Sequence, residues 1–371
     1  MTDRSLPPEG LEPPSQPVGL TLLDGVTPQV TDPMPLDAGR RLAADRDQEL
    51  DVRLAAYEDL LESEVGDTTL TRARNIEREA GMRQLYLKFE GSNPTGTQKD
   101  RIAFAQALDA LRLGYDAVTV ATCGNYGVAT ALAAAAAGLR CIVYMPEQYH
   151  SARVKEMERW GVELVRQPGD YEAAVDASQI RAERDEIYDA NPGGANTLIQ
   201  LRAYGEIAYE IYDELRDAPA AVAVPVSNGT TLAGIHHGFV SLYRRGKTSR
   251  IPRFIGGSSH GKNPVIHAWR RKLTTCENLD PQLIKESRVN EPLINWHSID
   301  GDLALEAIQS TDGWADECSD RAMTSAARDL REREGLSVLP ASTAGLLALL
   351  GRHQQQPLPG DRYVAILTGR R

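Results

Sequence analysis

Strand-like and helix-like segments alternate along most of this chain, and that alternation limits its possible folds more than any other feature. Short apolar runs rich in β-branched residues alternate with stretches whose apolar residues recur at a spacing near 3.6. The strand-like runs are 85–89, 116–122, 141–146, 162–167, 220–226, 253–259 and 363–368. The helix-like stretches begin near Asp47 and continue at 101–114, 127–137, 151–161, 203–216, 231–244, 319–333 and 342–352. This order predicts an α/β fold of mostly parallel sheets with helices on both faces.

The length of the chain predicts two lobes preceded by an arm. At 371 residues the chain exceeds what one small core usually holds. The first 35 residues contain eight of the 21 prolines, and proline neither continues a helix nor donates to a sheet. We therefore expect residues 1–45 to form an extended or mobile N-terminal arm, to which the sequence assigns no role.

The charge balance disfavours nucleic acid as a partner. The chain has 52 acidic and 41 basic residues, for a net charge of −11, whereas broad nucleic-acid binding needs a basic face. The start of the chain lacks a basic segment followed by an apolar run, so no secretory signal is expected. The most apolar stretch, 128–139, is too short to span a bilayer. These features predict a cytoplasmic protein without a membrane partner.

The cysteine and histidine patterns predict neither a disulfide framework nor a metal site. The cysteines lack a CxxC pair and are widely spaced, at Cys123, Cys141, Cys276 and Cys318. The histidine pair at 236–237 lies on an expected helix without a matching carboxylate or thiol pattern.

The stretch GSNPTGTQKDR at 91–101 holds a single lysine directly after a turn of small and hydrogen-bonding residues. Asn93, Pro94 and Gly96 build that turn, and Lys99 follows it. A solvated surface lysine needs no such preparation. The pattern is typical of a lysine that must form a covalent bond at a fixed place.

Two further strand-to-helix loops could hold a ligand. In VPVSNGTTLAGI (224–235) a glycine and several hydroxyls precede a helix, whose N-terminus favours a phosphate. The alternative is an ordinary capped turn, since neither a P-loop nor a GxGxxG pattern is present. In TCGNYG (122–127) Asn125 stands between glycines, where its amide could reach a ligand.

Together, NPTGTQKDR, TCGNYG and VSNGTTLAG resemble the lysine motif, the SGNTG loop and the glycine-rich phosphate cup of fold-type II pyridoxal-phosphate enzymes. The resemblance runs from about residue 65 to the end. It implies a two-lobed fold in which each lobe is a mostly parallel sheet flanked by helices, with pyridoxal 5'-phosphate between the lobes. It further implies a large lobe of residues 46–95 and 201–371, a small mobile lobe of residues 96–200, and a homodimer.

The resemblance also implies roles for individual residues. Lys99 would form the imine with the cofactor and, once displaced by substrate, would remove the α proton. Asn125 would hydrogen-bond the phenolic oxygen of the cofactor, and the pyridine nitrogen would face a hydroxyl, that of Thr368 or else of Ser342. A hydroxyl at that nitrogen favours elimination and replacement over transamination. The cofactor phosphate would be held by Ser227, Asn228, Gly229, Thr230 and Thr231.

The loop that begins at Thr122 would hold the carboxylate of an amino-acid substrate. Its backbone N–H groups and the Thr122 hydroxyl supply the donors in this reading. The implied substrate-binding residues are Thr122, Cys123, Gly124 and Tyr126. Cys123 stands where the family usually has serine or threonine, and a small buried thiol is the alternative.

Within the superfamily the chain most resembles threonine synthase, which converts O-phosphohomoserine and water to threonine and phosphate. Two departures leave other hypotheses open. Gln200 stands near the position of an arginine that helps to hold the substrate phosphate in that family, although Arg202 could substitute. The KDRIA stretch after Lys99 is closer to cysteine synthase. A serine/threonine dehydratase, a β-replacement enzyme and a catalytically silent cofactor-binding protein therefore stand beside a threonine synthase-like lyase.

Overall fold

The computed structural model describes residues 38–122, 124–149 and 153–371. Most of the expected arm, residues 1–37, therefore lies outside the described residues. Helix α1 (Ala38–Ala44) lies inside the range 1–45 that was expected to be extended or mobile. The helical part of the chain thus begins earlier than expected, shortly after the last proline of the N-terminal cluster.

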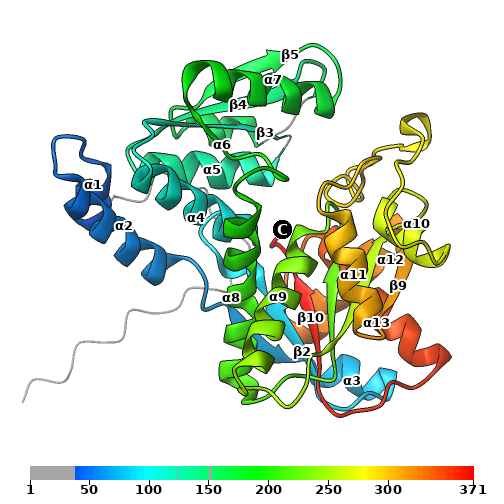
Figure 1. Cartoon of the computed structure of the whole chain (residues 1–371). Coiled ribbons are helices and arrows are strands. Elements are labelled where there is room, and N and C mark those ends of the chain that lie inside the picture. Colours follow the sequence, from blue (N-terminus) through cyan, green and yellow to red (C-terminus); the bar gives the residue numbers. More distant parts are fainter. Residues whose placement is uncertain (1–37, 123, 150–152) are drawn as a thin grey trace, which may run out of the picture. The chain divides into compact units, whose positions relative to one another are not determined.

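The strands form two separate sheets (Figure 1). The larger sheet has the order β1-β2-β10-β7-β8-β9, in which only β1 and β2 pair antiparallel, and the smaller, all-parallel sheet has the order β5-β4-β3-β6. The larger sheet consists of β1 (Thr69–Arg72), β2 (Leu85–Phe89), β7 (Ala221–Pro225), β8 (Arg253–Ser259), β9 (Trp314–Cys318) and β10 (Tyr363–Leu367). The smaller consists of β3 (Ala117–Ala121), β4 (Arg140–Pro146), β5 (Glu163–Gln167) and β6 (Tyr188–Asp189). The expected α/β fold with mostly parallel sheets is confirmed.

Helices cover the sheets, and α8 packs against helices of both groups (Figure 1). Around the smaller sheet lie α4 (Lys99–Arg112), α5 (Asn125–Ala136), α6 (Val154–Glu158) and α7 (Tyr171–Asp185). Around the larger sheet lie α3 (Arg74–Ala80), α9 (Thr230–Arg244), α10 (Pro264–Arg270), α11 (Gly301–Ser310), α12 (Asp320–Glu334) and α13 (Ala344–Gln355). Helix α8 (Thr197–Leu215) packs against α4 and α9. The 3₁₀ turns are η1 (Glu90–Ser92), η2 (Pro281–Leu283) and η3 (Pro340–Thr343).

The two faces of the larger sheet are buried in different hydrophobic clusters. Along β10, Val364 and Ile366 pack into one cluster, whereas Ala365 and Leu367 pack into the other. Side chains alternate between faces along a strand, so a strand buried on both faces is apolar throughout. This explains why β7 and β10 were recognisable as continuous apolar runs.

Some elements carried no such signal. Strand β9 has the sequence WADEC and lies at the edge of the larger sheet, where polar side chains meet solvent. Helix α7 follows a loop and has only a weak apolar stripe, and it was not expected either. Of the helix expected at 151–161, the described residues from 153 onward contain the short α6.

Helix α2 (Leu50–Glu64) packs on helices that surround the smaller sheet. Its range falls in the segment 46–95, which was expected to belong to the large lobe. The helix instead packs on α4 and α5: the Tyr57 hydroxyl donates to the Ala133 carbonyl over 3.1 Å, and the Tyr57 ring stacks on Phe104 at 6.0 Å between centroids. The strands of the smaller sheet all lie within the expected range 96–200.

The parallel strands place three loops at their carboxyl ends. The Thr122 loop follows β3, the Ser227 loop follows β7, and Thr368 follows β10. In open α/β sheets, ligands bind at this edge, because the loops and helix N-termini there are free to surround them. The topology therefore brings together three sites that are far apart in the sequence.

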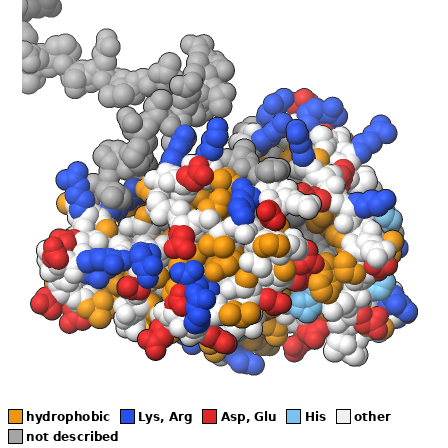
Figure 2. Space-filling model, turned by 90° about the horizontal axis from the view of Figure 1, so that it is seen from above, with side chains coloured by type: hydrophobic (Ala, Val, Ile, Leu, Met, Phe, Trp, Pro, Cys, Tyr) orange, Lys and Arg blue, Asp and Glu red, His pale blue; other side chains and the backbone are white. Residues whose placement is uncertain are grey.

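No helix among the described residues is both long and apolar enough to cross a membrane. Figure 2 shows basic and acidic side chains interspersed over the face that it draws. Such mixing is typical of a solvated surface.

Candidate active site

A cavity of about 720 Å³ opens between the carboxyl ends of the strands, and every described residue of the expected site lines it. These residues are Lys99, Thr122, Gly124, Asn125, Tyr126, Ser227, Asn228, Gly229, Thr230, Thr231, Ser342 and Thr368. Cys123, expected to bind substrate, lies outside the described residues. The structure thus brings into one cavity motifs that are spread over most of the sequence.

The turn before Lys99 is held by the residue that follows it. The Asp100 carboxylate accepts hydrogen bonds from the backbone N–H of Thr95, at 2.8 Å, and from its hydroxyl, at 2.7 Å. The Lys99 backbone N–H lies 3.3 Å from the Thr97 hydroxyl oxygen, which accepts from it. Burial raises the pKa of Asp100 to about 6. Lys99 is therefore the first residue of a helix whose start is fixed by its neighbours.

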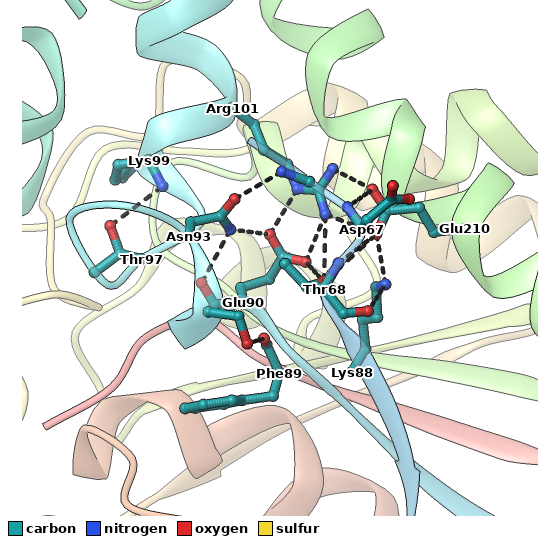
Figure 3. A network of polar contacts seen from close by, with 12 residues as sticks. Asp67, Thr68, Lys88, Phe89, Glu90, Asn93, Thr97, Lys99, Arg101 and Glu210 are labelled. Atoms are coloured by element: carbon teal, nitrogen blue, oxygen red, sulfur yellow. Dashed lines mark hydrogen bonds and ion pairs between the residues drawn. The ribbon is translucent and has the colours of Figure 1, made fainter. Parts of the chain in front are cut away.

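A buried network of charges lies at the start of this helix and holds it through Arg101 (Figure 3). The Arg101 guanidinium donates to Glu90 at 2.6 Å and to Glu210 at 2.7 Å, and Lys88 lies 2.5 Å from Glu210. The Asn93 amide donates to Glu90 over 3.0 Å, which links the network to the turn. Lys88, Glu90 and Arg101 are almost fully buried. The residues on either side of Lys99 in the motif are thus engaged in holding it in place.

Lys99 itself is left outside this network. Among the described residues no carboxylate lies within ion-pair distance of its amine, which faces the Tyr126 ring at 5.5 Å from the centroid. Burial lowers the pKa of Lys99 to about 8, and the charge of Asp300 opposes that shift. An amine with this pKa is partly neutral in mildly alkaline solution, so it can act as a nucleophile and as a base.

The Ser227 loop ends at the N-terminus of α9, where the backbone must take an unusual conformation. Gly229 has φ +97°, and a Cβ atom there would lie 2.8 Å from both the Ala304 methyl group and the Asp300 carbonyl oxygen. Only glycine fits this position. The Ser227 carbonyl oxygen accepts from the Asn263 amide at 2.9 Å, which fixes the loop. A helix N-terminus preceded by such a loop is a site for an anion such as phosphate.

Asp300 is a residue of this site that the sequence did not reveal. It precedes α11, it is 4% exposed, and its carboxylate accepts a hydrogen bond from the Thr230 hydroxyl. Burial raises its pKa, and the nearby Lys99 charge counteracts this. The Thr230 hydroxyl is therefore engaged by Asp300. No pattern around position 300 marks it in advance.

The Asn125 side chain is oriented by Arg153 of the neighbouring helix region. Its Oδ1 accepts a hydrogen bond from the Arg153 Nε at 3.0 Å, and Arg153 also donates to the Thr95 carbonyl at 3.3 Å. The amide nitrogen of Asn125 is thereby turned away from Arg153. This orientation suits the expected role of Asn125 as a hydrogen-bond donor to a ligand oxygen.

The other residues of the Thr122 loop differ in what they present to the cavity. The Gly124 N–H lies 3.3 Å from the Thr122 hydroxyl, which accepts from it. The Tyr126 hydroxyl donates to the Ala190 carbonyl at 2.7 Å, and Gln106 donates to it at 2.5 Å. Tyr126 therefore offers its ring to the cavity, while its hydroxyl is bound inside the protein.

The two hydroxyls proposed to face the pyridine nitrogen are hydrogen-bonded to each other. The Ser342 and Thr368 oxygens lie 3.1 Å apart, and the Ser342 hydroxyl also donates to the Gly369 carbonyl at 3.2 Å. Ser342 is 1% exposed, whereas Thr368 is partly exposed. Both line the cavity, and they act as one hydroxyl pair.

The position of Arg202 excludes one expectation. Gln200 lines the cavity and is fully buried, whereas Arg202 is exposed and does not line it. Residues two apart on a helix point to different sides, so Arg202 cannot replace an arginine at position 200. The expected substitution of that arginine by Arg202 is therefore wrong.

The residues of the cavity fit pyridoxal phosphate. The cofactor needs an amine, an anion site and a hydrogen-bonding partner for its ring nitrogen. Lys99, the glycine-dependent loop at the start of α9 and the Ser342–Thr368 pair provide these groups in one cavity. The strongest of these observations is the loop at Gly229, whose left-handed backbone and close contacts with Ala304 and Asp300 leave no room for a side chain.

Comparisons with known proteins agree with this geometry. Residues 61–369 match the family model described as "Pyridoxal-phosphate dependent enzyme". Threonine synthase of Methanocaldococcus jannaschii is 30% identical over 309 residues, which cover 82% of this chain and 74% of the relative. Threonine synthase of Mycobacterium tuberculosis is 28% identical over 287 residues, covering 77% of this chain and 75% of the relative.

Solved structures show the same fold at lower identity. Maize serine racemase superposes with a TM-score of 0.70 at 17% identity, covering 89% of this chain and 95% of its own. The processed form of a threonine deaminase from Solanum lycopersicum gives a TM-score of 0.68 at 17% identity, covering 88% of this chain and 90% of its own. From the family match, its extent and the agreement in fold, we conclude that this chain belongs to the pyridoxal-phosphate dependent enzymes of fold type II.

Proposed function

We propose that this protein is a lyase that uses pyridoxal phosphate to eliminate or replace a group on the side chain of an amino acid. The observation that carries the proposal is the placement of Lys99. Its amine has a pKa lowered to about 8 and lies in one cavity with the α9 loop and the Thr122 loop. The threonine synthases that match most of the chain support the same chemistry.

The bound cofactor would supply an electron sink for the charge that develops when the α proton leaves. Ser227, Asn228, Gly229, Thr230 and Thr231 would hold its phosphate at the start of α9. This role follows from the loop conformation and from the positive end of the helix dipole.

Three other groups would orient the cofactor ring. Asn125 would donate to the phenolic oxygen from the amide nitrogen that Arg153 leaves available. Thr368 or Ser342 would face the ring nitrogen as a neutral hydroxyl. Such a partner does not hold the nitrogen protonated as a carboxylate would, which favours loss of a leaving group over transamination.

Lys99 would take the α proton of the substrate at its Nζ atom. Burial favours the neutral amine, and the turn fixed by Asp100 holds the helix start that carries it. Thr122, Gly124 and Tyr126 would bind the substrate carboxylate through the backbone N–H groups of their loop. The corresponding role of Cys123 belongs to the same proposal.

A threonine synthase-like reaction on O-phosphohomoserine is the specific form of this proposal. Its test is incubation of the purified holoenzyme with O-phosphohomoserine, with measurement of phosphate and threonine. Release of both at equal rates is expected for this reaction. Absence of phosphate release, with cofactor bound, would eliminate it.

A serine/threonine dehydratase or a β-replacement enzyme is the second candidate, and the neutral side chain of Gln200 favours it. A panel of serine, threonine and O-acetylserine, the last with sulfide, tests it through keto acid formation and sulfide consumption. A protein that keeps bound cofactor but reacts with none of these amino acids would be catalytically silent. We further propose a homodimer in the cytoplasm, which sedimentation of the purified protein and cell fractionation would test.

A further inference from the structure

The Arg153 side chain connects two loops of the candidate active site. Its Nε donates to the Asn125 Oδ1 at 3.0 Å, and another nitrogen of the same guanidinium donates to the Thr95 carbonyl at 3.3 Å. Asn125 is the first residue of α5, and Thr95 belongs to the turn before Lys99. One guanidinium therefore contacts both the expected partner of the phenolic oxygen and the turn that positions the amine.

The chemistry of the two side chains fixes the direction of the contact between Arg153 and Asn125. A guanidinium group only donates hydrogen bonds, so the Asn125 oxygen must face Arg153 and the amide nitrogen must face away. Among the described residues, no group accepts a hydrogen bond from that nitrogen. Nor does the nitrogen belong to the fully buried polar atoms without a partner, so it is accessible, and Asn125 lines the cavity. The Asn125 amide therefore has a donor available for a ligand.

The charge of Arg153 makes Asn125 a stronger donor. A cation at the amide oxygen draws electron density away from the nitrogen, so the hydrogen bonds that this nitrogen donates become stronger. The Arg153 side chain is 27% exposed, so water screens its charge only in part. A strong donor stabilises an ionised oxygen more than a neutral hydroxyl, and it therefore lowers the pKa of that hydroxyl.

The same charge acts on the turn before the candidate catalytic lysine. Burial raises the pKa of Asp100 to about 6. Hydrogen bonds from Thr95 oppose that rise, and so do the charges of Arg153 and Arg370. The ionised carboxylate is the form that accepts both hydrogen bonds from Thr95. Glu156 lies 2.6 Å from the guanidinium and holds it in place, so Arg153 is fixed by one carboxylate and supports the ionised form of another.

We propose that Arg153 is a positioning residue that, acting through Asn125, keeps the phenolic oxygen of bound pyridoxal phosphate ionised. The inference rests on the proposed function, because it takes Asn125 to be the partner of that oxygen. The proton that the phenol loses resides on the nitrogen of the imine with Lys99. A protonated imine is the form that the amine of an incoming amino acid attacks, so Arg153 favours the exchange of Lys99 for substrate.

Absorbance of the cofactor-loaded protein tests the inference, because the ionised form of the cofactor imine absorbs at longer wavelength than the neutral form. Arg153→Gln retains a polar side chain but removes the charge. We expect it to lower the ratio of the long-wavelength to the short-wavelength band by about fivefold, the difference between a charge-assisted and a neutral hydrogen bond. Arg153→Lys restores the charge and should give a ratio between the two. Arg159→Gln is the matched control, because Arg159 is exposed at the end of α6, and it should not change the ratio.

A double variant tests whether Arg153 acts through Asn125. Asn125→Ala should lower the ratio by at least as much as Arg153→Gln does. In the double variant the ratio should stay within about twofold of that in Asn125→Ala alone, because no amide remains to carry the effect. A further loss of about fivefold in the double variant, or an unchanged ratio in Asn125→Ala, would overturn the inference. Should Arg153→Gln not fold, Arg153→Lys takes its place, with a lowered ratio as a single variant and no further change in Asn125→Ala.

The outcomes separate this inference from the proposed function. An unchanged band ratio in Arg153→Gln, in a protein whose unmodified form eliminates or replaces a group on an amino acid, would overturn the inference and leave the lyase standing. A lowered ratio in a protein that reacts with none of the amino acids tested would support the inference and contradict the lyase. The absorbance of the cofactor-loaded protein is measured without substrate, so it decides the role of Arg153 whatever the reaction is.

Discussion

Lys88 and Lys99 lie close together in the sequence, but Lys88 is buried, Lys99 is half-buried, and their surroundings are opposite. Lys88 is 1% exposed, lies 2.5 Å from Glu210, and donates to the Thr68 carbonyl at 2.5 Å (Figure 3). Lys99 lies in the cavity, and its pKa is lowered to about 8 because burial is not offset by an adjacent carboxylate. A buried charge that is fully paired serves the fold, whereas an unpaired one is available for chemistry. The difference teaches that burial alone does not identify the reactive lysine.

Replacing Lys99 by alanine is expected to have the largest effect. Activity should fall by a factor of about 10² to 10⁴, the usual contribution of a general base, and the cofactor should no longer be covalently attached. The free energy of unfolding should change by less than about 1 kcal/mol, because Lys99 takes no part in the buried network. Turnover assays, borohydride reduction with peptide mapping, and urea unfolding measure these three quantities.

Lys88→Met is the matched variant for that experiment. It should lower the free energy of unfolding and leave the cofactor attached to Lys99. If Lys99→Ala kept its activity, or if reduction trapped the cofactor on another side chain, the proposed difference in role between the two lysines would be wrong.

Arg101→Met tests whether the buried charge network stabilises the fold. It leaves Glu90, which is fully buried, without its cation, and it removes one partner of Glu210. Removing one member of a buried ion pair typically costs about 3 to 5 kcal/mol. Urea unfolding of the cofactor-loaded protein measures the loss. Arg101→Lys keeps the charge but not the bidentate geometry, so it should lower the free energy of unfolding by less. An equal loss of stability in both variants would show that the geometry matters and the charge alone does not.

Gly229→Ala tests whether the loop that contains Gly229 binds an anion. Alanine there would have φ +97° and would contact Ala304 and the Asp300 carbonyl at 2.8 Å, so we expect a loss of about 1 to 3 kcal/mol in stability. The same distortion should weaken cofactor binding by a similar free energy, which corresponds to an affinity about tenfold lower. Gly246→Ala is the control, because Gly246 has φ +68° with open space around a Cβ atom. An unchanged cofactor affinity in Gly229→Ala would remove this loop from the phosphate site.

The smallest predicted effect is a lowered midpoint in the pH dependence of covalent cofactor uptake. Burial disfavours the ammonium form of Lys99, so its amine is protonated below about pH 8 and neutral above it. Only the neutral amine attacks the cofactor aldehyde. The rate at which cofactor-free protein takes up pyridoxal phosphate covalently should therefore rise with pH, with a midpoint near about 8. Stopped-flow absorbance measures it, and a midpoint near the ordinary lysine value of about 10.4 would show that burial does not act as proposed.

The sequence predicted the candidate site because its signals are local. Lys99, Asn125 and Gly229 each lie in a short motif next to a strand or at a helix start, and the strands are continuous apolar runs. These patterns predicted the mostly parallel sheets, and the family resemblance implied that the motifs would surround one cofactor. The packing of α2 on α4, and its Tyr57 hydrogen bond to α5, were not predictable in this way, because the sequence of a helix does not specify which surface covers it.

The amino-acid sequence by itself determined the class of fold and the cofactor family, and it singled out Lys99 as the candidate for the chemistry. Only the tertiary structure decided that Asp300 accepts a hydrogen bond from Thr230, that Glu291 lies close to Gly124 of the Thr122 loop, and that the Gln200 amide donates to Gln106. Each of these groups acts on a residue far away in the chain. Its charge or hydrogen-bonding direction is set by neighbours that the fold brings close, so no local pattern records it.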